Sequence, residues 1–238
     1  MPVQREGIVR RTMTLFFVID ASGSMAGAKI GSVNESIENV LPMIDDISIN
    51  NPDAEIKVAA LEFSTDTRWL YNEPKSAKEF IWQPVEAEVL TSLGAACKEL
   101  ESKLHKSNGG FMSSPSGCYA PVIILLSDGE PTDNYQEGLS VLQNNNWFKN
   151  AIKIAIAIGD DANKDVLKEF TGSIERVITV HTIDALKKMI EIIAVTSSQI
   201  GSSSSTADKD KQDKVIDQIS DVVDSTSGVN DNTPDEWD

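Results

Sequence analysis

The sequence predicts an α/β protein built on a doubly wound, mostly parallel central sheet with helices on both faces. Short apolar runs that suit buried strands alternate along the chain with longer segments whose apolar residues recur at helical spacing. This alternation of strands and helices favours a parallel sheet covered on both faces. Two of the strands also end abruptly in an aspartate, and open α/β sheets bind ligands at the carboxyl ends of their strands.

The expected elements follow one another from the N-terminal strand Thr14–Ile19 and the helix Ala28–Ile47, whose apolar residues lie on one face. The further expected strands are Glu55–Phe63, a hairpin partner at Thr67–Tyr71, Val122–Leu126, Lys153–Ile158 and Val177–Val180. The further expected helices are Lys75–Ile81, a segment that starts near Thr91, Asn134–Asn144, Asn163–Phe170 and Ile183–Val195.

The segment Leu15–Met25, with the sequence LFFVIDASGSM, ends a buried strand in one carboxylate and two hydroxyls. These groups belong to Asp20, Ser22 and Ser24, and alternate residues of a tight loop point the same way, so we expect them to converge. Oxygen ligands with a single formal charge suit Mg²⁺, which keeps waters or an outside ligand in its remaining positions. Aspartate and serine are also common helix caps, and capping is the alternative for this segment taken alone.

Two later segments carry matching chemistry. In Pro121–Asp133, PVIILLSDGEPTD, an apolar strand delivers Asp128 into a turn that contains Gly129. Between this segment and the first loop, Thr91 and Ser92 precede a stretch with the spacing of an amphipathic helix. The alternatives are a simple turn at Asp128 and a helix cap at Thr91 or Ser92.

In this order and at these separations, DASGSM, the Thr91 loop and LLSDGEPTD resemble the three loops of the metal-ion-dependent adhesion site in von Willebrand factor A domains. The resemblance covers roughly residues 13–196. It implies that two serines and a threonine coordinate a cation or position its waters, and that two aspartates bind it directly or through water. The implied metal ligands are Asp20, Ser22, Ser24, Thr91 and Asp128, with Mg²⁺ as the expected ion and Mn²⁺ or Ca²⁺ as the alternatives.

The threonine loop departs from the family pattern, because Glu88–Leu90 precede Thr91 where many relatives have glycines. An exchange of roles between Thr91 and Ser92 therefore stays open. The SDGEPTD run and the short domain resemble the bacterial tellurium-resistance TerY-type subgroup more closely than the secreted adhesive members. That resemblance implies a role in a tellurite or general stress response, with a protein kinase-like partner and a PP2C-type phosphatase partner.

Length and charge narrow the class of protein. The chain of 238 residues is consistent with an N-terminal extension at residues 1–12, one domain at 13–196 and a tail. Its formal net charge is −16, from 37 acids and 21 bases, which disfavours binding to nucleic acid or to anionic lipid. The sequence shows no secretory or membrane segment. Cys97 and Cys118 are expected to be free thiols, and a cytoplasmic location follows from these expectations.

The tail, residues 197–238, begins with a serine-rich linker composition, and from Asp208 onward it carries ten acids against three lysines. Most of it is expected to be disordered. Within residues 214–224, valines and isoleucines recur on one helical face. Such a helix either is transient or rests on the domain's own surface, or it docks a partner.

The ligand set favours binding over catalysis. Two acids and three hydroxyls leave a metal electrophilic, so the site should attract a partner's Asp or Glu, and no nucleophile with an activating neighbour accompanies it. Only His105 and His181 could support histidine catalysis; His105 falls at a helix end and His181 is expected at the surface. A metal-dependent phosphoesterase is the alternative, but a phosphoryl-aspartate hydrolase would need a second acid where this chain has Ser22. We therefore expect a non-enzymatic interaction module.

Overall fold

The computed structural model describes residues 10–107, 109–112, 117–201, 208–223, 225–229, 234 and 237. Within these residues, seven strands form one sheet in the order β3-β2-β1-β5-β6-β7, and β4 also pairs with β2. The strands are β1 (Arg11–Asp20), β2 (Ala54–Phe63), β3 (Thr67–Trp69), β4 (Lys75–Ser76), β5 (Val122–Ser127), β6 (Ile152–Ile158) and β7 (Val177–Val180). Only β3 and β4 run antiparallel to their neighbour, so the predicted mostly parallel, doubly wound sheet is confirmed.

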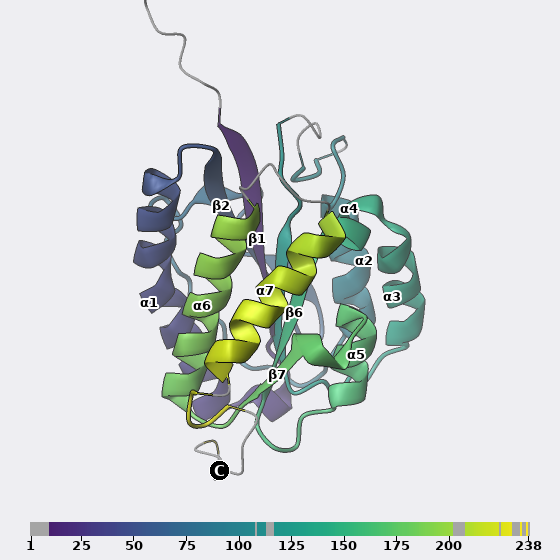
Figure 1. The fold of residues 1–238 in the computed structure, drawn as a ribbon. Helices are drawn as coiled ribbons and strands as arrows, with labels where there is room; N and C mark the ends of the chain where they lie inside the picture. The colour runs from purple at the N-terminus through teal and green to yellow at the C-terminus, as the bar shows by residue number, and fades with distance from the viewer. Residues whose placement is uncertain are drawn as a thin grey trace, which may run out of the picture.

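Helices cover both faces of the sheet, as Figure 1 shows. One apolar core joins the sheet to α1 (Ala28–Asn50), α6 (Ile183–Gly201) and α7 (Asp208–Val223). The other core joins it to α2 (Leu93–Lys103), α3 (Tyr135–Asn144), α4 (Asn146–Asn150) and α5 (Lys164–Thr171). Short 3₁₀ turns lie at Gly23–Met25 and Ile174–Arg176.

The central strand β1 shows why helices cover both faces of the sheet. Its side chains alternate between the two cores: Leu15 and Phe17 enter the core under α1 and α6, whereas Phe16 and Val18 enter the core under α2. A strand buried on both faces reads as a continuous apolar run rather than as an alternating one. The run therefore ends where the chain leaves the sheet, at Asp20.

The order of the strands reverses between β1 and β5. From β1 the chain moves to β2 and β3 on one side, and it then returns to β5, β6 and β7 on the other side. The register pairs Ile19 with Leu126, so Asp20 and the residues that follow β5 leave the sheet side by side. Ligands of open α/β sheets bind at such a switch point, because the two connections diverge and leave a crevice between them.

One predicted helix is wrong. Over Lys75–Ile81, the chain forms the two-residue strand β4 followed by turns, because Lys75 and Ser76 pair with Val58 and Lys57 at the edge of β2. The local pattern did not reveal this long-range pairing, which overrides helix propensity. The chain also forms α4, which was not predicted. The side chain of Asn145 caps α4 by accepting hydrogen bonds from two backbone amides.

The described part of the tail contains a helix, whereas composition predicted that most of the tail is disordered. Helix α7 begins at Asp208, six residues before the predicted 214–224 segment, and it packs along α6 (Figure 1). Val215 and Ile219 are fully or almost fully buried, and Val229 pairs with Val180 at the edge of β7. The apolar face therefore rests on the domain's own surface, which was one of the two alternatives for this helix. Residues 202–207 lie outside the described residues.

Both cysteines are buried and neither forms a disulfide, as predicted. Burial raises the pKa of the Cys97 thiol to about 12, so this group stays protonated and unreactive near neutral pH. Among the described residues, no helix combines the length and the apolar character needed to cross a membrane.

Candidate metal centre

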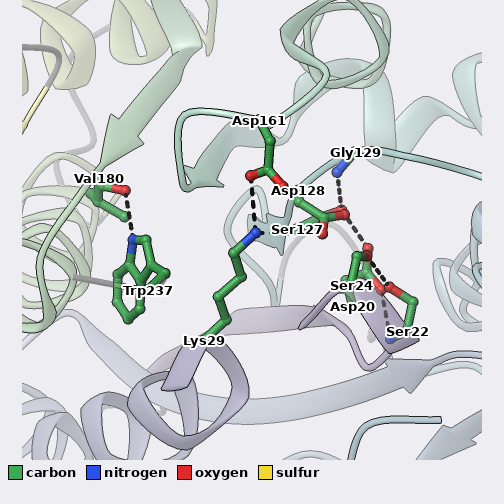
Figure 2. Close-up of polar contacts among 10 residues, drawn as sticks. All are labelled: Asp20, Ser22, Ser24, Lys29, Ser127, Asp128, Gly129, Asp161, Val180 and Trp237. Carbon is green, nitrogen blue, oxygen red and sulfur yellow. Dashed lines mark hydrogen bonds and ion pairs between the residues drawn. The ribbon is translucent and has the colours of Figure 1, made fainter. Parts of the chain in front are cut away.

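Asp20 is the last residue of β1, and a network of hydrogen bonds holds its carboxylate. Its Oδ1 accepts a hydrogen bond from the backbone amide of Ser22 at 2.9 Å, and its Oδ2 accepts one from the hydroxyl of Ser127 at 2.6 Å. The hydroxyls of Ser22 and Ser24 lie 3.0 Å apart, so the three oxygen-bearing side chains of the first loop gather on one side, as Figure 2 shows. Ser24 is the exposed member of this group.

Asp128 follows β5 and has an unusual environment. Its side chain is 1% exposed, and neither carboxylate oxygen accepts a hydrogen bond from any described residue. The nearest cation is the ammonium of Lys29, 3.9 Å from Oδ2, which is too far for a hydrogen bond. A buried carboxylate with no donor is costly unless something else satisfies it. Gly129 allows the turn after Asp128 because its φ is +73° and a Cβ there would lie 2.7 Å from a backbone oxygen.

The structure distinguishes Thr91 from Ser92. Thr91 is buried, and its hydroxyl makes no hydrogen bond to a described residue, whereas the hydroxyl of Ser92 donates to the backbone oxygen of Thr65 at 3.3 Å. Ser92 stands at the N-cap of α2 but does not cap it with its side chain. Of the two residues, Thr91 therefore keeps a hydroxyl available for a ligand.

The segment that carries Asp128 also builds the threonine loop. The hydroxyl of Thr132 accepts a hydrogen bond from the amide of Thr91 at 3.0 Å. The carboxylate of Asp133 accepts hydrogen bonds from the amides of Gly94 and Ala95 at 3.1 and 3.2 Å, so it caps α2 in place of Ser92. The run SDGEPTD thus contains Asp128 and connects it to Asp20, through Ser127, and to the loop of Thr91.

Sequence reasoning missed two residues at this site. Ser127 donates to Asp20 and accepts from the amide of Gly129 at 2.7 Å. The only local signal was a hydroxyl at the end of an otherwise apolar strand. Lys29 contacts both Asp128 and Asp161, and its position in the first turn of α1 gave no sign of this.

The residues present fit a hard divalent cation. All five predicted ligand residues carry oxygen donors, and the orphaned carboxylate of Asp128 is the type of group that such a cation satisfies. Among the described residues, no group of three or more acidic, histidine or cysteine side chains could hold a metal by itself. A metal bound here would therefore need neutral hydroxyls to complete its ligand set, and both the five ligands and the occupancy of the site stay predictions.

Comparison with known proteins gives the family. The profile described as von Willebrand factor type A domain matches residues 14–192. The chain belongs to this family. The inter-alpha-trypsin inhibitor heavy chain H2 of Sus scrofa is 29% identical to this VWA domain in an alignment of 169 residues that covers 66% of the chain and 17% of that protein. The collagen alpha-6(VI) chain of Homo sapiens is 25% identical over 74% of the chain and 7% of that protein. The chain thus spans less than a fifth of these relatives.

Solved structures show the same fold. The SpaC pilus adhesin of Lactobacillus rhamnosus GG matches 80% of the chain and 30% of its own length, with a TM-score of 0.62 and 14% identity. A von Willebrand factor type A protein from Catenulispora acidiphila matches 79% and 43%, with a TM-score of 0.57 and 16% identity. Proximal thread matrix protein 1 of the mussel byssus, solved with a zinc-occupied MIDAS motif, matches 80% and 47%, with a TM-score of 0.54 and 18% identity. At these identities the likeness concerns the fold.

Metal binding by this VWA domain should depend on pH near 6. Burial raises the pKa of the Asp20 carboxyl to about 6, hydrogen bonds from Ser127 and Ser22 oppose that shift, and the charge of Asp128 adds to it. A proton then competes with the cation below pH 6, so we expect the apparent Mg²⁺ affinity to be constant from pH 8 to 7 and to fall about tenfold per unit below pH 6. Calorimetric titrations at several pH values would measure this.

The metal-free protein provides the control for that titration. Because the native pKa of Asp20 lies above its ordinary value of 3.8, the native state takes up this proton before the unfolded state does. The contribution of Asp20 to the free energy of unfolding should therefore increase as the pH falls from about 6 towards 3.8. An Mg²⁺ affinity that stays constant down to pH 5 would contradict the assignment of Asp20 as a ligand.

Proposed function

We propose that this VWA domain is a non-enzymatic, Mg²⁺-dependent protein-interaction module whose metal captures an Asp or Glu side chain of a partner protein. The observation that carries the proposal is the carboxylate of Asp128, which is buried without a hydrogen-bond donor beside a loop of converging oxygen ligands. The proposed ligands are Asp20, Ser22, Ser24, Thr91 and Asp128, and Mn²⁺ or Ca²⁺ could replace Mg²⁺.

The composition of the ligand set supports capture of an acid. Two carboxylates balance the charge of a divalent cation, and the three hydroxyls donate little further charge to it. A bound Mg²⁺ would supply a Lewis-acidic position for an outside oxygen ligand. An acidic side chain is the protein group that best satisfies such a position, since it combines an oxygen donor with a negative charge.

The surroundings of the site support binding rather than catalysis. The hydroxyl of Ser127, the serine in contact with Asp20, is buried and donates its hydrogen bond to that carboxylate. His181, expected at the surface, is buried instead, and its Nδ1 lies 3.2 Å from Asp160. His105 lies beyond the C-terminal end of α2, 2.7 Å from Glu101. Both ion pairs join a histidine to an acid outside the proposed ligand set, which favours binding over histidine-assisted hydrolysis.

The biological setting of the module is a narrower proposal. The SDGEPTD run supports placing the protein with the TerY-type tellurium-resistance subgroup, in a tellurite or general stress response. Its partners would then be a protein kinase-like protein and a PP2C-type phosphatase, either of which could present the acid. Two buried cysteines outside any disulfide favour a reducing compartment such as the cytoplasm. Genes for a kinase and a phosphatase next to this one would support the setting.

A pull-down from lysate of the native organism tests the module. We expect full-length protein to retain a partner in Mg²⁺ and to lose most of it in EDTA, because the partner's acid binds through the metal. Asp20→Asn should lose the partner in both buffers. The same protein should not turn over phosphoesters. Mg²⁺-dependent hydrolysis that disappears in Asp20→Asn would instead establish the phosphoesterase alternative.

A further inference from the structure

Lys29 lies between two aspartates at the edge of the sheet that carries the candidate metal site (Figure 2). Its Nζ is 3.9 Å from Oδ2 of Asp128 and 2.9 Å from Oδ1 of Asp161. The side chain of Lys29 is only 10% exposed, although the residue stands in the first turn of α1. A cation is unfavourable both in a buried position and at a helix N-terminus, where the backbone amides already present positive charge. Nearby negative charge must therefore compensate it.

The chain leaves space for this ammonium at Gly159, which follows β6 with a φ of +94°. A Cβ at Gly159 would lie 3.2 Å from both Nζ and Cε of Lys29 and 2.8 Å from Oδ1 of Asp161. Three elements thus meet around the charge: the start of α1, the turn after β5 and the turn after β6 (Figure 2). The side chain of Lys29 is therefore fixed by the surrounding elements and is not a mobile surface lysine.

The two ion pairs differ in distance and in environment. The closer partner, Asp161, is 70% exposed, so water and salt screen its attraction to Lys29. The more distant partner, Asp128, is 1% exposed and has no hydrogen-bond donor. Charges interact far more strongly in a poorly solvated environment than at the surface. The pair at 3.9 Å should therefore contribute more to stability than the pair at 2.9 Å.

We propose that Lys29 is the internal counter-charge of the metal site. In the metal-free protein its ammonium balances the buried carboxylate of Asp128. When a divalent cation is bound, the same ammonium lowers the affinity for that cation by repulsion and leaves the site with surplus positive charge. That surplus favours an acidic ligand over water, so Lys29 would help to select the partner's acid. This second part rests on the proposed function, whereas the first part does not.

The first part is tested by thermal unfolding of the full chain in EDTA. Lys29→Met keeps the length of the apolar stem and should lower the melting temperature by about 5 °C or more. In an Asp128→Asn background, Lys29→Met should lower the melting temperature much less. In an Asp161→Asn background, it should lower the melting temperature almost as much as in the native sequence. Lys29→Arg should melt close to the native protein.

The dependence of Lys29→Met on Asp128 can be tested even if Lys29→Met alone does not fold. Folding of the double variant Lys29→Met, Asp128→Asn would then show the expected coupling. The proposal is overturned if neither variant folds, if Lys29→Met costs the same with and without Asp128, or if the loss depends on Asp161 instead.

The second part is tested by calorimetric titration with Mg²⁺. Removing the repelling charge in Lys29→Met should tighten the dissociation constant about tenfold, and Lys29→Arg should leave it unchanged. An unchanged or weaker constant in Lys29→Met would overturn the effect on the bound cation. If the native protein binds no Mg²⁺, the proposed function fails, and the unfolding experiments in EDTA still decide whether Lys29 balances Asp128.

Discussion

Replacing Asp20 with alanine is expected to abolish Mg²⁺ binding while leaving the protein folded. The change removes one of the two charged ligands proposed for the site, and it also removes the carboxylate that positions Ser22 and Ser127. Even the loss of groups that only orient metal ligands typically costs about 10- to 100-fold in affinity, so the loss of a charged ligand should exceed about 100-fold. Calorimetric titration with Mg²⁺ measures the affinity directly.

The fold should survive this substitution. Burial raises the pKa of Asp20 to about 6, so its ionised form opposes the native state at pH 7, and the neighbouring charge of Asp128 adds to that effect. Removing the carboxylate relieves both costs, which offsets the hydrogen bonds that are lost. We therefore expect the melting temperature of Asp20→Ala in EDTA to change little and no longer to respond to Mg²⁺.

A neighbouring pair of residues provides the matched control. Thr91→Ala should weaken Mg²⁺ binding, because its hydroxyl makes no hydrogen bond to a described residue. Ser92→Ala should not, because its hydroxyl bonds to the backbone of Thr65. Native affinity in Asp20→Ala, or a larger loss in Ser92→Ala than in Thr91→Ala, would show that the ligands are assigned incorrectly.

Replacing Ile219 with aspartate is expected to cause the largest loss of stability. Ile219 is 2% exposed and lies on the face of α7 that enters the core shared with α1 and α6. The change loses apolar burial, leaves a cavity and places a charge in an apolar environment. Together these effects should cost about 4 kcal/mol, which corresponds to a fall of about 10 °C in the melting temperature.

The preceding residue of α7 supplies the control for charge. Gln218 is exposed, so Gln218→Asp introduces the same carboxylate without entering the core, and it should change the melting temperature little. Thermal unfolding followed by circular dichroism compares the two variants. If Ile219→Asp melts like the native protein and loses a partner, α7 is a docking helix rather than part of the core.

Much of the fold could be predicted from local patterns. The buried strands follow from short continuous apolar runs and most helices from an apolar period of 3.6 residues, and both patterns are visible in a short window of sequence. The helix predicted at Asn134–Asn144 and the strand at Val177–Val180 agree with α3 and β7 to within a residue. The two acids of the proposed site were visible for a similar reason, since an acid that interrupts an apolar run marks the end of a buried strand, whereas the full ligand set came from the resemblance to VWA domains.

Contacts between distant segments could not be predicted in this way. The hydroxyl of Ser127 reaches Asp20 only because the register between β1 and β5 places them side by side, and a register one residue different would turn that side chain away. The pairing of Lys75 with Val58 likewise replaced a predicted helix with a strand.

The tail helix and the ammonium of Lys29 show the same contrast between local patterns and long-range contacts. Composition indicated that residues from 197 onward are acidic and rich in serine, and the helical spacing of valines and isoleucines located an apolar face, but neither revealed which surface would cover that face. The packing of α7 on α6 decides this. The charge next to Asp128 comes from Lys29, nearly a hundred residues earlier in the chain. Periodicity and composition are local properties, whereas burial and charge pairing depend on which distant segments the fold brings together.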